Sequence, residues 1–339
     1  MNLADKIEQM KPLKRAAENS SSEPAGDPSV VNPYQAYTVG VGDHFIKALN
    51  GNTITTGVGN SYITSDEGSN TVTTGAGNST IIVAGSGNNT ITTGVGNSGI
   101  FAGSGNDTIT TGVGHSYINA GGGNNTITTG IGNSVIFAGN GNNTIVTGAG
   151  HSYIDVCDGN NTITAGAGDS VIFAGGGNNV IATGAGHSKI FAGSGNNIIT
   201  TGAGDSIVFA GDGNDSDGDN VVTTGAGTNT VVTGGGDDTI ITSAGDDKIT
   251  GGGGDDILTG GSGSDTFFFG PRGGNDIIMD FATGTDKIDF SGYGYGFGFD
   301  MSFITQTTAG VTIDFGDGNS ITLIGIASLN VADFVFASS

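Results

Sequence analysis

Tryptophan is absent from this chain of 339 residues, and cysteine, proline and basic residues are scarce. The single cysteine, Cys157, excludes an intrachain disulfide. Nine lysines and arginines stand against 32 acidic residues, which gives a net charge of −23. A nucleic-acid partner is excluded because phosphate binding needs clustered basic side chains. No run of about 18 apolar residues occurs, so we expect no transmembrane helix.

The N-terminal 36 residues are polar and lack the apolar core of a cleavable signal peptide, so we do not expect one. Four of the nine basic residues lie within the first fifteen positions, namely Lys6, Lys11, Lys14 and Arg15. Three consecutive serines and several prolines follow. We predict a disordered arm over residues 1–36, in which Leu3–Met10 could form a short helix.

Glycine is abundant, with 67 residues, and lacks the three-residue period of collagen. Aliphatic residues recur from about Val39, with an unbroken step of nine from Ile91 to Val208 and again from Val222 to Phe267. One inward aliphatic residue per nine suits a coil of two short strands and two glycine turns, with 18 residues per coil. Stacked coils about 4.8 Å apart bury a core that one coil cannot. This pattern predicts an all-β parallel β-roll, or β-solenoid.

The repeat resembles the nonapeptide GGxGxDxUx of the repeats-in-toxin (hemolysin-type) family, where U is a large apolar residue. The best matches are TGGGDDTII (233–241), TSAGDDKIT (242–250), GGGGDDILT (251–259) and GGSGSDTFF (260–268). The resemblance implies a secreted, calcium-binding roll. Residues 273–292 and the ending SLNVADFVFASS resemble the segment that follows the repeats in this family and its type I secretion region. They imply a C-terminal β cap, export, and an extracellular or cell-surface location.

Five regions follow from these observations. We assign residues 1–36 to the arm, 37–210 to repeats of an Asn/Ser type, 211–220 to an acidic insertion, 221–268 to calcium-binding repeats of an Asp type, and 269–339 to the cap and secretion region.

Calcium binds six to eight oxygens from carboxylates and carbonyls. The resemblance assigns Ca²⁺ to the sixth-position aspartates of the repeat. Successive turns alternate between two edges, so Asp238 and Asp256 should share one edge and Asp247 and Asp265 the other. We add their neighbours Asp237, Asp246 and Asp255 as candidate metal ligands. Between residues 50 and 210 the position holds Asn or Ser, with Asp107 as the lone carboxylate, so the family's ligands do not transfer there. Stacked amides and hydroxyls should hydrogen-bond between coils instead.

The two outer faces differ. One carries a Thr-x-Thr ladder, which resembles the ice-binding face of β-helical antifreeze proteins and is also explained by the β propensity of threonine. Its members are Thr53, Thr55, Thr71, Thr73, Thr90, Thr92, Thr108, Thr110, Thr126, Thr128, Thr162 and Thr164. The other face carries outward Phe101, Phe137, Phe173, Phe191 and Phe209. Exposed apolar stripes usually mark contacts, so this face is a candidate for self-association or for binding a surface or polysaccharide, unless the arm or cap covers it.

No catalytic signature appears. The four histidines form no HExxH pair, and no GxSxG motif is present. We therefore expect a non-enzymatic protein with a structural, adhesive or surface-interaction role. Ice binding through the threonine ladder and a carbohydrate-active enzyme accessory are the alternatives.

Overall fold

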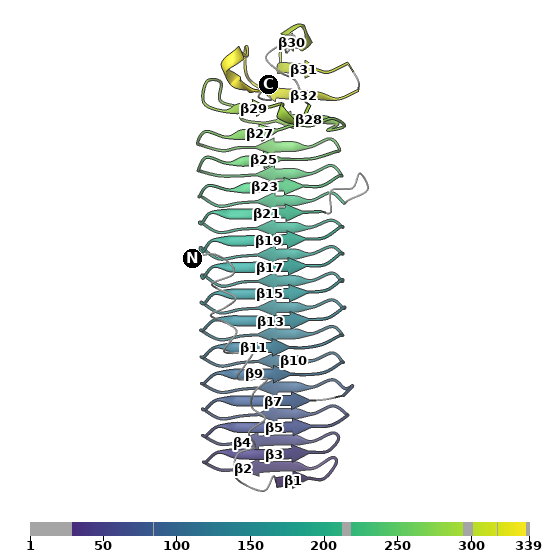
Figure 1. Ribbon diagram of the computed structural model, residues 1–339, viewed down its shortest axis with the longest axis vertical. Coiled ribbons are helices and arrows are strands. Elements are labelled where there is room, and N and C mark those ends of the chain that lie inside the picture. Colours follow the sequence, from purple (N-terminus) through teal and green to yellow (C-terminus); the bar gives the residue numbers. More distant parts are fainter. Residues whose placement is uncertain (1–28, 84, 212–217, 294–300, 317, 337–339) are drawn as a thin grey trace. The chain divides into compact units, whose positions relative to one another are not determined.

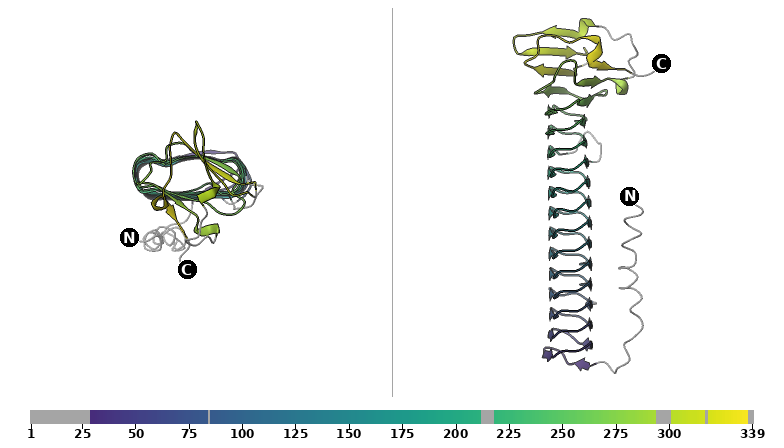
Figure 2. Two further views of the ribbon diagram at one scale, coloured as in Figure 1. Left: turned by 90° about the horizontal axis from the view of Figure 1, so that it is seen from above. Right: turned by 90° about the vertical axis from the view of Figure 1, so that its left-hand side faces the viewer.

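The computed structural model describes residues 29–83, 85–211, 218–293, 301–316 and 318–336. The chain divides into unit 1, which ends at Phe173, and unit 2, which begins at Ala174. In both units, short strands alternate between two parallel sheets, A and B, and each coil contributes one strand to each sheet (Figures 1 and 2). No helix among the described residues is long and apolar enough to cross a membrane.

In unit 1, sheet A contains β1 (Ser29–Val31), β3 (His44–Ala48), β5 (Ser61–Ser65), β7 (Ser79–Val83), β9 (Ser98–Phe101), β11 (Ser116–Asn119), β13 (Ser134–Ala138), β15 (Ser152–Val156) and β17 (Ser170–Ala174), whose last residue belongs to unit 2. Sheet B contains β2 (Ala36–Val39), β4 (Thr53–Thr56), β6 (Thr71–Thr73), β8 (Thr90–Thr92), β10 (Thr108–Thr110), β12 (Thr126–Thr128), β14 (Thr144–Val146) and β16 (Thr162–Thr164).

The core of unit 1 is a ladder of isoleucines between the two sheets. Ile109 pairs with Ile127 in sheet B, and Ile118 pairs with Ile136 in sheet A; all four are fully buried. Side chains alternate along a strand, so one residue in two faces inward. Because equivalent residues are 18 positions apart, every coil places its isoleucines above those of the coil before it. The predicted parallel β-roll is confirmed.

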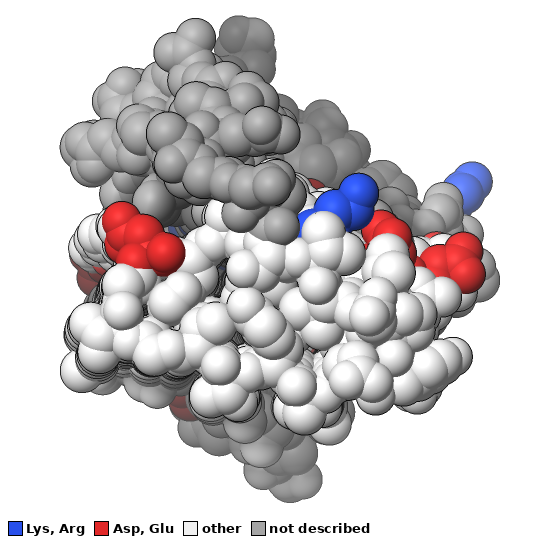
Figure 3. All heavy atoms as spheres, turned by 90° about the horizontal axis from the view of Figure 1, so that it is seen from below, with Lys and Arg blue, Asp and Glu red and all other residues white. Residues whose placement is uncertain are grey.

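Glycine allows the turns to stack closely. Gly132 has a φ of 143°, a backbone conformation that L side chains rarely adopt. A Cβ atom at Gly132 would also collide with the carbonyl oxygen of Gly114 in the preceding coil. Seen from the N-terminal end, the first coils show few charged side chains among the described residues, and these lie at the rim (Figure 3).

In unit 2, sheet A contains β19 (Ser188–Ala192), β21 (Ser206–Ala210), β23 (Thr230–Thr233), β25 (Lys248–Thr250), β27 (Thr266–Phe268), β29 (Lys287–Asp289) and β33 (Phe334–Val335). Sheet B contains β18 (Val180–Ala182), β20 (Ile198–Thr200), β22 (Val221–Thr223), β24 (Thr239–Ile241), β26 (Ile257–Thr259), β28 (Asn275–Ile278), β30 (Ile304–Gln306), β31 (Gly310–Asp314) and β32 (Ser320–Ile324). Three short 3₁₀ helices are η1 (Ser291–Tyr293), η2 (Met301–Phe303) and η3 (Val331–Asp333).

The predicted C-terminal β cap is also present. β32 pairs with β28, and β30, β31 and β32 form an antiparallel meander. Phe290 lies at the centre of an aromatic cluster, with ring centroids 5.4 Å from Phe315 and 5.7 Å from Phe334. Large rings therefore close the end of a core that consists mainly of isoleucine and valine in the preceding coils.

The first coil begins earlier than the sequence suggested. β1 pairs with β3 and β2 with β4, so residues 29–39 belong to the roll, although most of them were assigned to the arm. These strands lack the Thr-Ile-Thr pattern, which is why the nine-residue count missed them. Residues 1–28 of the arm and residues 212–217 of the acidic insertion lie outside the described part of the chain.

Candidate metal centre

The turns lie along two edges of the coils. We call the edge that leads from sheet A to sheet B the Asn edge, and the edge that leads back the Ser edge. On the Asn edge of unit 1, buried asparagines form a hydrogen-bonded ladder between coils. The Nδ2 group of Asn143 donates to Asn161 Oδ1 of the next coil at 3.0 Å, and to the carbonyls of Gly139 and Gly141 in its own turn at 3.1 and 2.9 Å. One amide thus satisfies three oxygens, as a bound cation would.

The Ser edge of unit 1 works differently. Most buried serines pair with a threonine five residues before them in the same coil, as in Thr129 with Ser134 and Thr147 with Ser152, both at 2.8 Å between hydroxyl oxygens. Ser170 follows Ala165 instead, and its hydroxyl donates to the carbonyl of Gly168 at 3.4 Å. The expectation that amides bond between coils is met on the Asn edge. The serine hydroxyls bond within a coil, because they are too short to reach the next one.

Within unit 2, the buried position of the turns changes to aspartate, from Asp238 onward on the Asn edge and from Asp247 onward on the Ser edge. On the Asn edge, Asp238 N donates to Asp256 Oδ1 at 2.9 Å, and Asp256 N donates to Asp276 Oδ1 at 3.0 Å. On the Ser edge, Asp247 N donates to Asp265 Oδ1 at 2.9 Å, and Asp265 N to Asp286 Oδ1 at 3.0 Å. Each edge of unit 2 therefore carries a row of carboxylates, and all of these side chains are buried.

These carboxylates fit the calcium that the sequence implies. The second oxygens of Asp238, Asp247 and Asp265 are buried and have no hydrogen-bond partner within the protein. A buried anionic oxygen is costly unless it is paired or coordinates a metal. The turns make room for the carboxylates through glycine, since a Cβ atom at Gly251 or Gly260 would collide with Asp256 or Asp265, respectively. Carboxylate and carbonyl oxygens in glycine turns are the ligands that Ca²⁺ prefers.

Burial raises the pKa of several of these groups. The pKa of Asp256 rises to about 9 through desolvation, with repulsion from Asp276 and Asp238 adding to it. Desolvation also raises the pKa of Asp276 to about 7 and those of Asp238 and Asp265 to about 6. The rows therefore hold protons that isolated aspartates would release. A cation between the coils would offset both the desolvation and the repulsion.

We expect calcium binding to release protons near neutral pH. Metal ligation requires ionised carboxylates; at pH 7 in the metal-free fold Asp256 holds its proton, and Asp276, with a pKa of about 7, is about half protonated. Because the folded-state pKa values are raised above the ordinary value of 3.8, the metal-free rows are most stable at acid pH and lose stability as the pH rises from about 4 to about 9. Calorimetric titration at pH 7 in buffers of different ionisation enthalpy should show roughly one to two protons released, and calcium affinity should rise with pH.

The exposed Asp237 offers a matched control for this measurement. Its Oδ1 accepts the backbone N–H of Asp255 at 2.8 Å, a bond that asparagine can also accept. The charge of Asp237 is the smallest cause of the raised pKa of Asp256, so Asp237→Asn should lower proton release only slightly, whereas Asp256→Asn should reduce it strongly. Release that is absent in the unaltered chain at pH 7 would contradict the assignment.

Two members of the rows, Asp276 and Asp286, escaped the sequence analysis. They lie 20 and 21 residues after Asp256 and Asp265 instead of 18, so the nine-residue count passes them by. A local signal was available: each stands two residues before an inward isoleucine, in GGNDII (273–278) and TGTDKID (283–289). Asp280 was also missed; its two oxygens accept the N–H groups of Gly260 and Gly261.

The other three metal candidates from the sequence have a different environment. Asp237, Asp246 and Asp255 are exposed, and their Oδ1 atoms accept backbone N–H groups of Asp255, Ser264 and Asn275 across coils. They lie outside the buried rows and act as hydrogen-bonding caps on the turns. Among the described residues, no three acidic, histidine or cysteine side chains converge on one point. A calcium ion held between these turns would draw on their backbone carbonyls as well as on the carboxylates.

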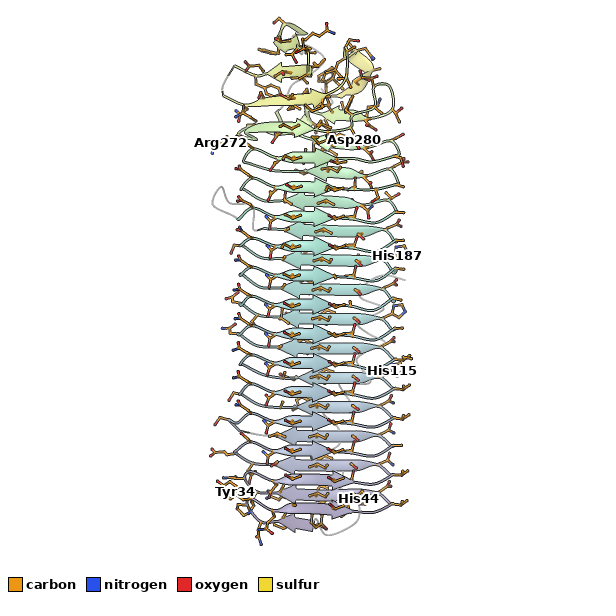
Figure 4. All side chains as sticks on the ribbon, turned by 180° about the vertical axis from the view of Figure 1, so that it is seen from behind. Tyr34, His44, His115, His187, Arg272 and Asp280 are labelled. Atoms are coloured by element: carbon orange, nitrogen blue, oxygen red, sulfur yellow. The ribbon has the colours of Figure 1, made fainter. Side chains whose placement is uncertain are left out.

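The histidines belong to the outer layer of the Ser edge. His115 projects from this edge, and its Nδ1 accepts the N–H of Asn133 at 3.1 Å (Figure 4). His151 Nδ1 takes the N–H of Asp169 in the same way. Histidine thus replaces the asparagine side chain that does this in other coils, such as Asn133, which accepts from His151.

The outer faces have the strand register that the sequence predicts, but the exposure of their side chains differs from the prediction. In sheet B of unit 1, Thr108 and Thr110 stand opposite Thr126 and Thr128, and all four are exposed. The Phe face is less exposed than we expected: Phe209 is 38% exposed, while Phe101, Phe137, Phe173 and Phe191 are half-buried. Rings in neighbouring coils pack together and so remove part of their apolar surface from water. The rings of Phe191 and Phe209, for example, are stacked with their centroids 5.4 Å apart. Nothing further in the structure favours ice binding.

Comparison with known proteins agrees with this geometry. The family model of the RTX calcium-binding nonapeptide repeat (4 copies) matches residues 49–81, 82–118, 119–154, 158–190, 191–216, 215–240 and 232–267, which is more than half of the chain. No curated protein sequence matches the chain.

Two solved structures are similar to parts of the chain. One is the extracellular lipase LipA from Serratia marcescens, at 19% identity and a TM-score of 0.26, over 62% of this chain. The chain spans only 40% of the length of that lipase. The other is the AlgE6R3 subunit of the mannuronan C5-epimerase from Azotobacter vinelandii, at 26% identity and a TM-score of 0.22, over 40% of this chain and 79% of that one. The extent of the family match shows that the chain belongs to the family of RTX calcium-binding nonapeptide-repeat proteins.

Proposed function

We propose that this chain is a secreted, non-enzymatic roll with a structural or adhesive role, and that calcium orders the aspartate rows of unit 2. The observation that carries the proposal is the set of buried, unpartnered oxygens on Asp238, Asp247 and Asp265. Unit 1 replaces these charges with an amide ladder in which Asp107 is the one carboxylate among the described residues. A metal-independent unit 1 and a calcium-dependent unit 2 suit a protein that becomes rigid where calcium is abundant, outside the cell.

The contact surface that we propose lies on unit 2. In its sheet B, most of the column that holds threonine in unit 1 is aliphatic: Val180 pairs with Ile198, and Ile198 with Val221, while Thr239 stands between Val221 and Ile257. Ile198 is 50% exposed and Ile257, further along the column, 42%. On the opposite outer face, in sheet A, Phe209 and the half-buried Phe191 from the sequence prediction form a stacked pair, which we propose as a separate contact site. Adjacent exposed aliphatic side chains mark a contact surface more strongly than scattered ones.

Removing the aliphatic column should weaken adsorption to apolar surfaces. We expect Ile198→Ser, Val221→Ser and Ile257→Ser together to lower the affinity of the full chain for an alkyl-coated sensor in calcium buffer. Burying the exposed half of each side chain is worth about 1 kcal/mol, so the three together account for about 3 kcal/mol. The binding constant should fall by roughly a hundredfold.

Thr108→Ser with Thr126→Ser is the matched control, because these residues occupy the same outward column in unit 1. The control should bind like the unaltered chain. Equal binding by the aliphatic triple variant would contradict the proposed surface, and circular dichroism of both variants checks that the roll is intact.

Export is proposed to depend on the C-terminal segment. In an exporting host, deletion of residues 325–339 should keep the protein in the cytoplasm. The same segment caps the roll, since Phe334 packs on Phe290 and Asp333 accepts the N–H of Gly284 at 2.8 Å. Phe334→Ala separates the two roles, because it loosens the cap and keeps the segment. Export of the deletion at the normal level would contradict a secretion signal there.

A further inference from the structure

A ridge of exposed aliphatic side chains runs along the Ser edge of unit 1, the edge from which His115 projects (Figure 4). Each turn on this edge reads Gly-x-Gly, with residue x at its apex. In the first six turns the apex is valine or isoleucine five times, and these side chains are 49 to 84% exposed. Ala76 occupies the remaining apex. The five exposed side chains, which we call the Ser-edge ridge, are Val41, Val58, Val95, Val113 and Ile131.

The backbone holds the side chains of the Ser-edge ridge in line. The carbonyl of each apex residue accepts the N–H of the glycine that follows the apex in the preceding coil. Val113 O, for example, accepts Gly96 N at 2.8 Å, and Ile131 O accepts Gly114 N at 2.9 Å. Neighbouring apexes are therefore one strand spacing apart, about 4.8 Å. Because glycine stands on both sides of every apex, a strip without side chains follows each flank of the ridge.

The same stretch of the Ser edge carries almost no charge. Between residues 57 and 133 its five turns read GVGN, GAGN, GVGN, GVGH and GIGN, without an acidic residue, lysine or arginine. Further along the edge the apex is alanine, as at Ala149 and Ala167, and an acidic residue returns at Asp169. Aliphatic apexes thus coincide with a lack of charge, as in the core of a protein interface. In a chain with a net charge of −23, a second copy can approach this stretch without meeting a row of carboxylates.

We propose that the Ser-edge ridge is an interface between two copies of this chain, which pack ridge against ridge in antiparallel directions. A second copy supplies a line of side chains with the same period, so every coil of one ridge meets a coil of the other. Lines of aliphatic side chains at this spacing interdigitate and exclude water, as they do in steric zippers. The antiparallel register sets Ala76 of one copy beside Val95 of the other and fills the gap in the ridge. A parallel register would set Ala76 against Ala76 and leave a void, which close packing disfavours.

The area of the Ser-edge ridge sets the strength that we expect of this interface. Five side chains with about half or more of their surface exposed present roughly 500 Å² on each copy, so the two copies together bury about 1,000 Å². An interface of this size is typical of weak or transient complexes, and we expect a dissociation constant in the micromolar range. The ridge lies on unit 1 and the contact surface proposed above lies on unit 2, so the two proposals can fail separately.

Sedimentation velocity of the full chain in calcium buffer tests the interface. The unaltered chain should pass from monomer to dimer as its concentration rises through the micromolar range. Val95→Asp with Val113→Asp should raise the dissociation constant at least about a hundredfold, because the dimer would bury unpaired carboxylates from both copies. Ala149→Asp with Ala167→Asp adds the same charge at apexes beyond the ridge. This matched control should dimerise like the unaltered chain, and circular dichroism checks that both variants keep the roll.

Disulfide cross-linking tests the register in chains that also carry Cys157→Ala. Oxidation of a mixture of Ala76→Cys chains and Val95→Cys chains should join one chain of each kind, because the antiparallel register sets these two apexes side by side. If Ala76→Cys chains are instead joined mainly to each other, the copies pack in parallel and the proposed register is wrong.

Three other results would overturn the interface. The unaltered chain could remain monomeric at every concentration up to about 1 mM, a strength too weak for the buried area. The two aspartate pairs could weaken dimerisation equally, which would show that added charge acts without regard to the ridge. A chain that is monomeric, and that loses adsorption to an alkyl-coated sensor only in Val95→Asp with Val113→Asp, would show that the ridge binds an apolar surface and not a second copy.

Discussion

Replacing Asn143 with aspartate is expected to unfold the middle of the roll locally. The substitution removes the Nδ2 donor that serves Gly139 O, Gly141 O and Asn161 Oδ1, and it places a carboxylate against those three oxygens. Each buried hydrogen bond contributes about 1 kcal/mol, and an unsatisfied buried acceptor costs about 1–3 kcal/mol. We expect a loss of about 3–5 kcal/mol. Hydrogen exchange in β12 to β16, measured in chelator, should accelerate at least about a hundredfold.

Asn142→Asp is the control, because it makes the same chemical change one residue away. The exposed Asn142 contributes its Oδ1, which accepts the N–H of Asn160 at 2.8 Å, and aspartate retains that acceptor. Its exchange rates should stay close to those of the unaltered chain. Calcium should partly restore protection in Asn143→Asp, since the new carboxylate and the freed carbonyls reproduce the ligands of the aspartate rows. Equal exchange in both variants would show that the amide ladder does not hold the turns.

Asp107 is a natural instance of this substitution. It stands in the amide ladder of unit 1, with its Oδ1 accepting Asn89 N at 2.7 Å and Asn89 Nδ2 at 2.9 Å. Its Oδ2 is buried without a partner, and desolvation raises its pKa. A single aspartate is tolerated in the ladder because the adjacent coils on both sides carry asparagine, Asn89 and Asn125, at the same position.

The sequence predicts the roll because the apolar residues that recur every nine positions are the same residues that form the core. A side chain such as Ile127 must face inward once per nine residues, and only a two-strand coil allows this. The edge assignments of Asp238 with Asp256 and of Asp247 with Asp265 follow from the same count, and their backbone hydrogen bonds agree with it.

The nine-residue count could not identify residues that lie where the period is interrupted. Insertions of two and three residues hide Asp276 and Asp286, whose place in the rows depends on the pairing of β28 and β29. The pattern also does not predict how much of each outward side chain is exposed to solvent. Phe137 and Tyr117 occupy the outward positions that the count gives them, but their burial depends on packing against rings in adjacent coils.

Removing calcium is expected to disorder the aspartate rows while unit 1 stays folded. Carboxylates about 5 Å apart in adjacent coils repel by roughly 1–3 kcal/mol per pair without a cation, and burial adds to this cost. Such energies are comparable with the stability of a few repeats. At pH 8 in excess chelator, hydrogen exchange should become fast in β24 to β29 and remain slow in β6 to β16. Magnesium should not substitute, because it demands small octahedral sites and keeps its waters.

Charge removal distinguishes ligation in these rows from general attraction to an acidic surface. Asp247→Ala with Asp256→Ala takes one buried carboxylate from each edge and should weaken calcium binding at least about tenfold, or about 1.4 kcal/mol. Asp237→Ala with Asp246→Ala removes the same charge from exposed neighbours, whose Oδ1 atoms accept only backbone N–H groups among their described bonds. That pair should bind calcium nearly as well as the unaltered chain. If both pairs weaken binding equally, the ions are held by the net charge of −23 and not by the buried rows.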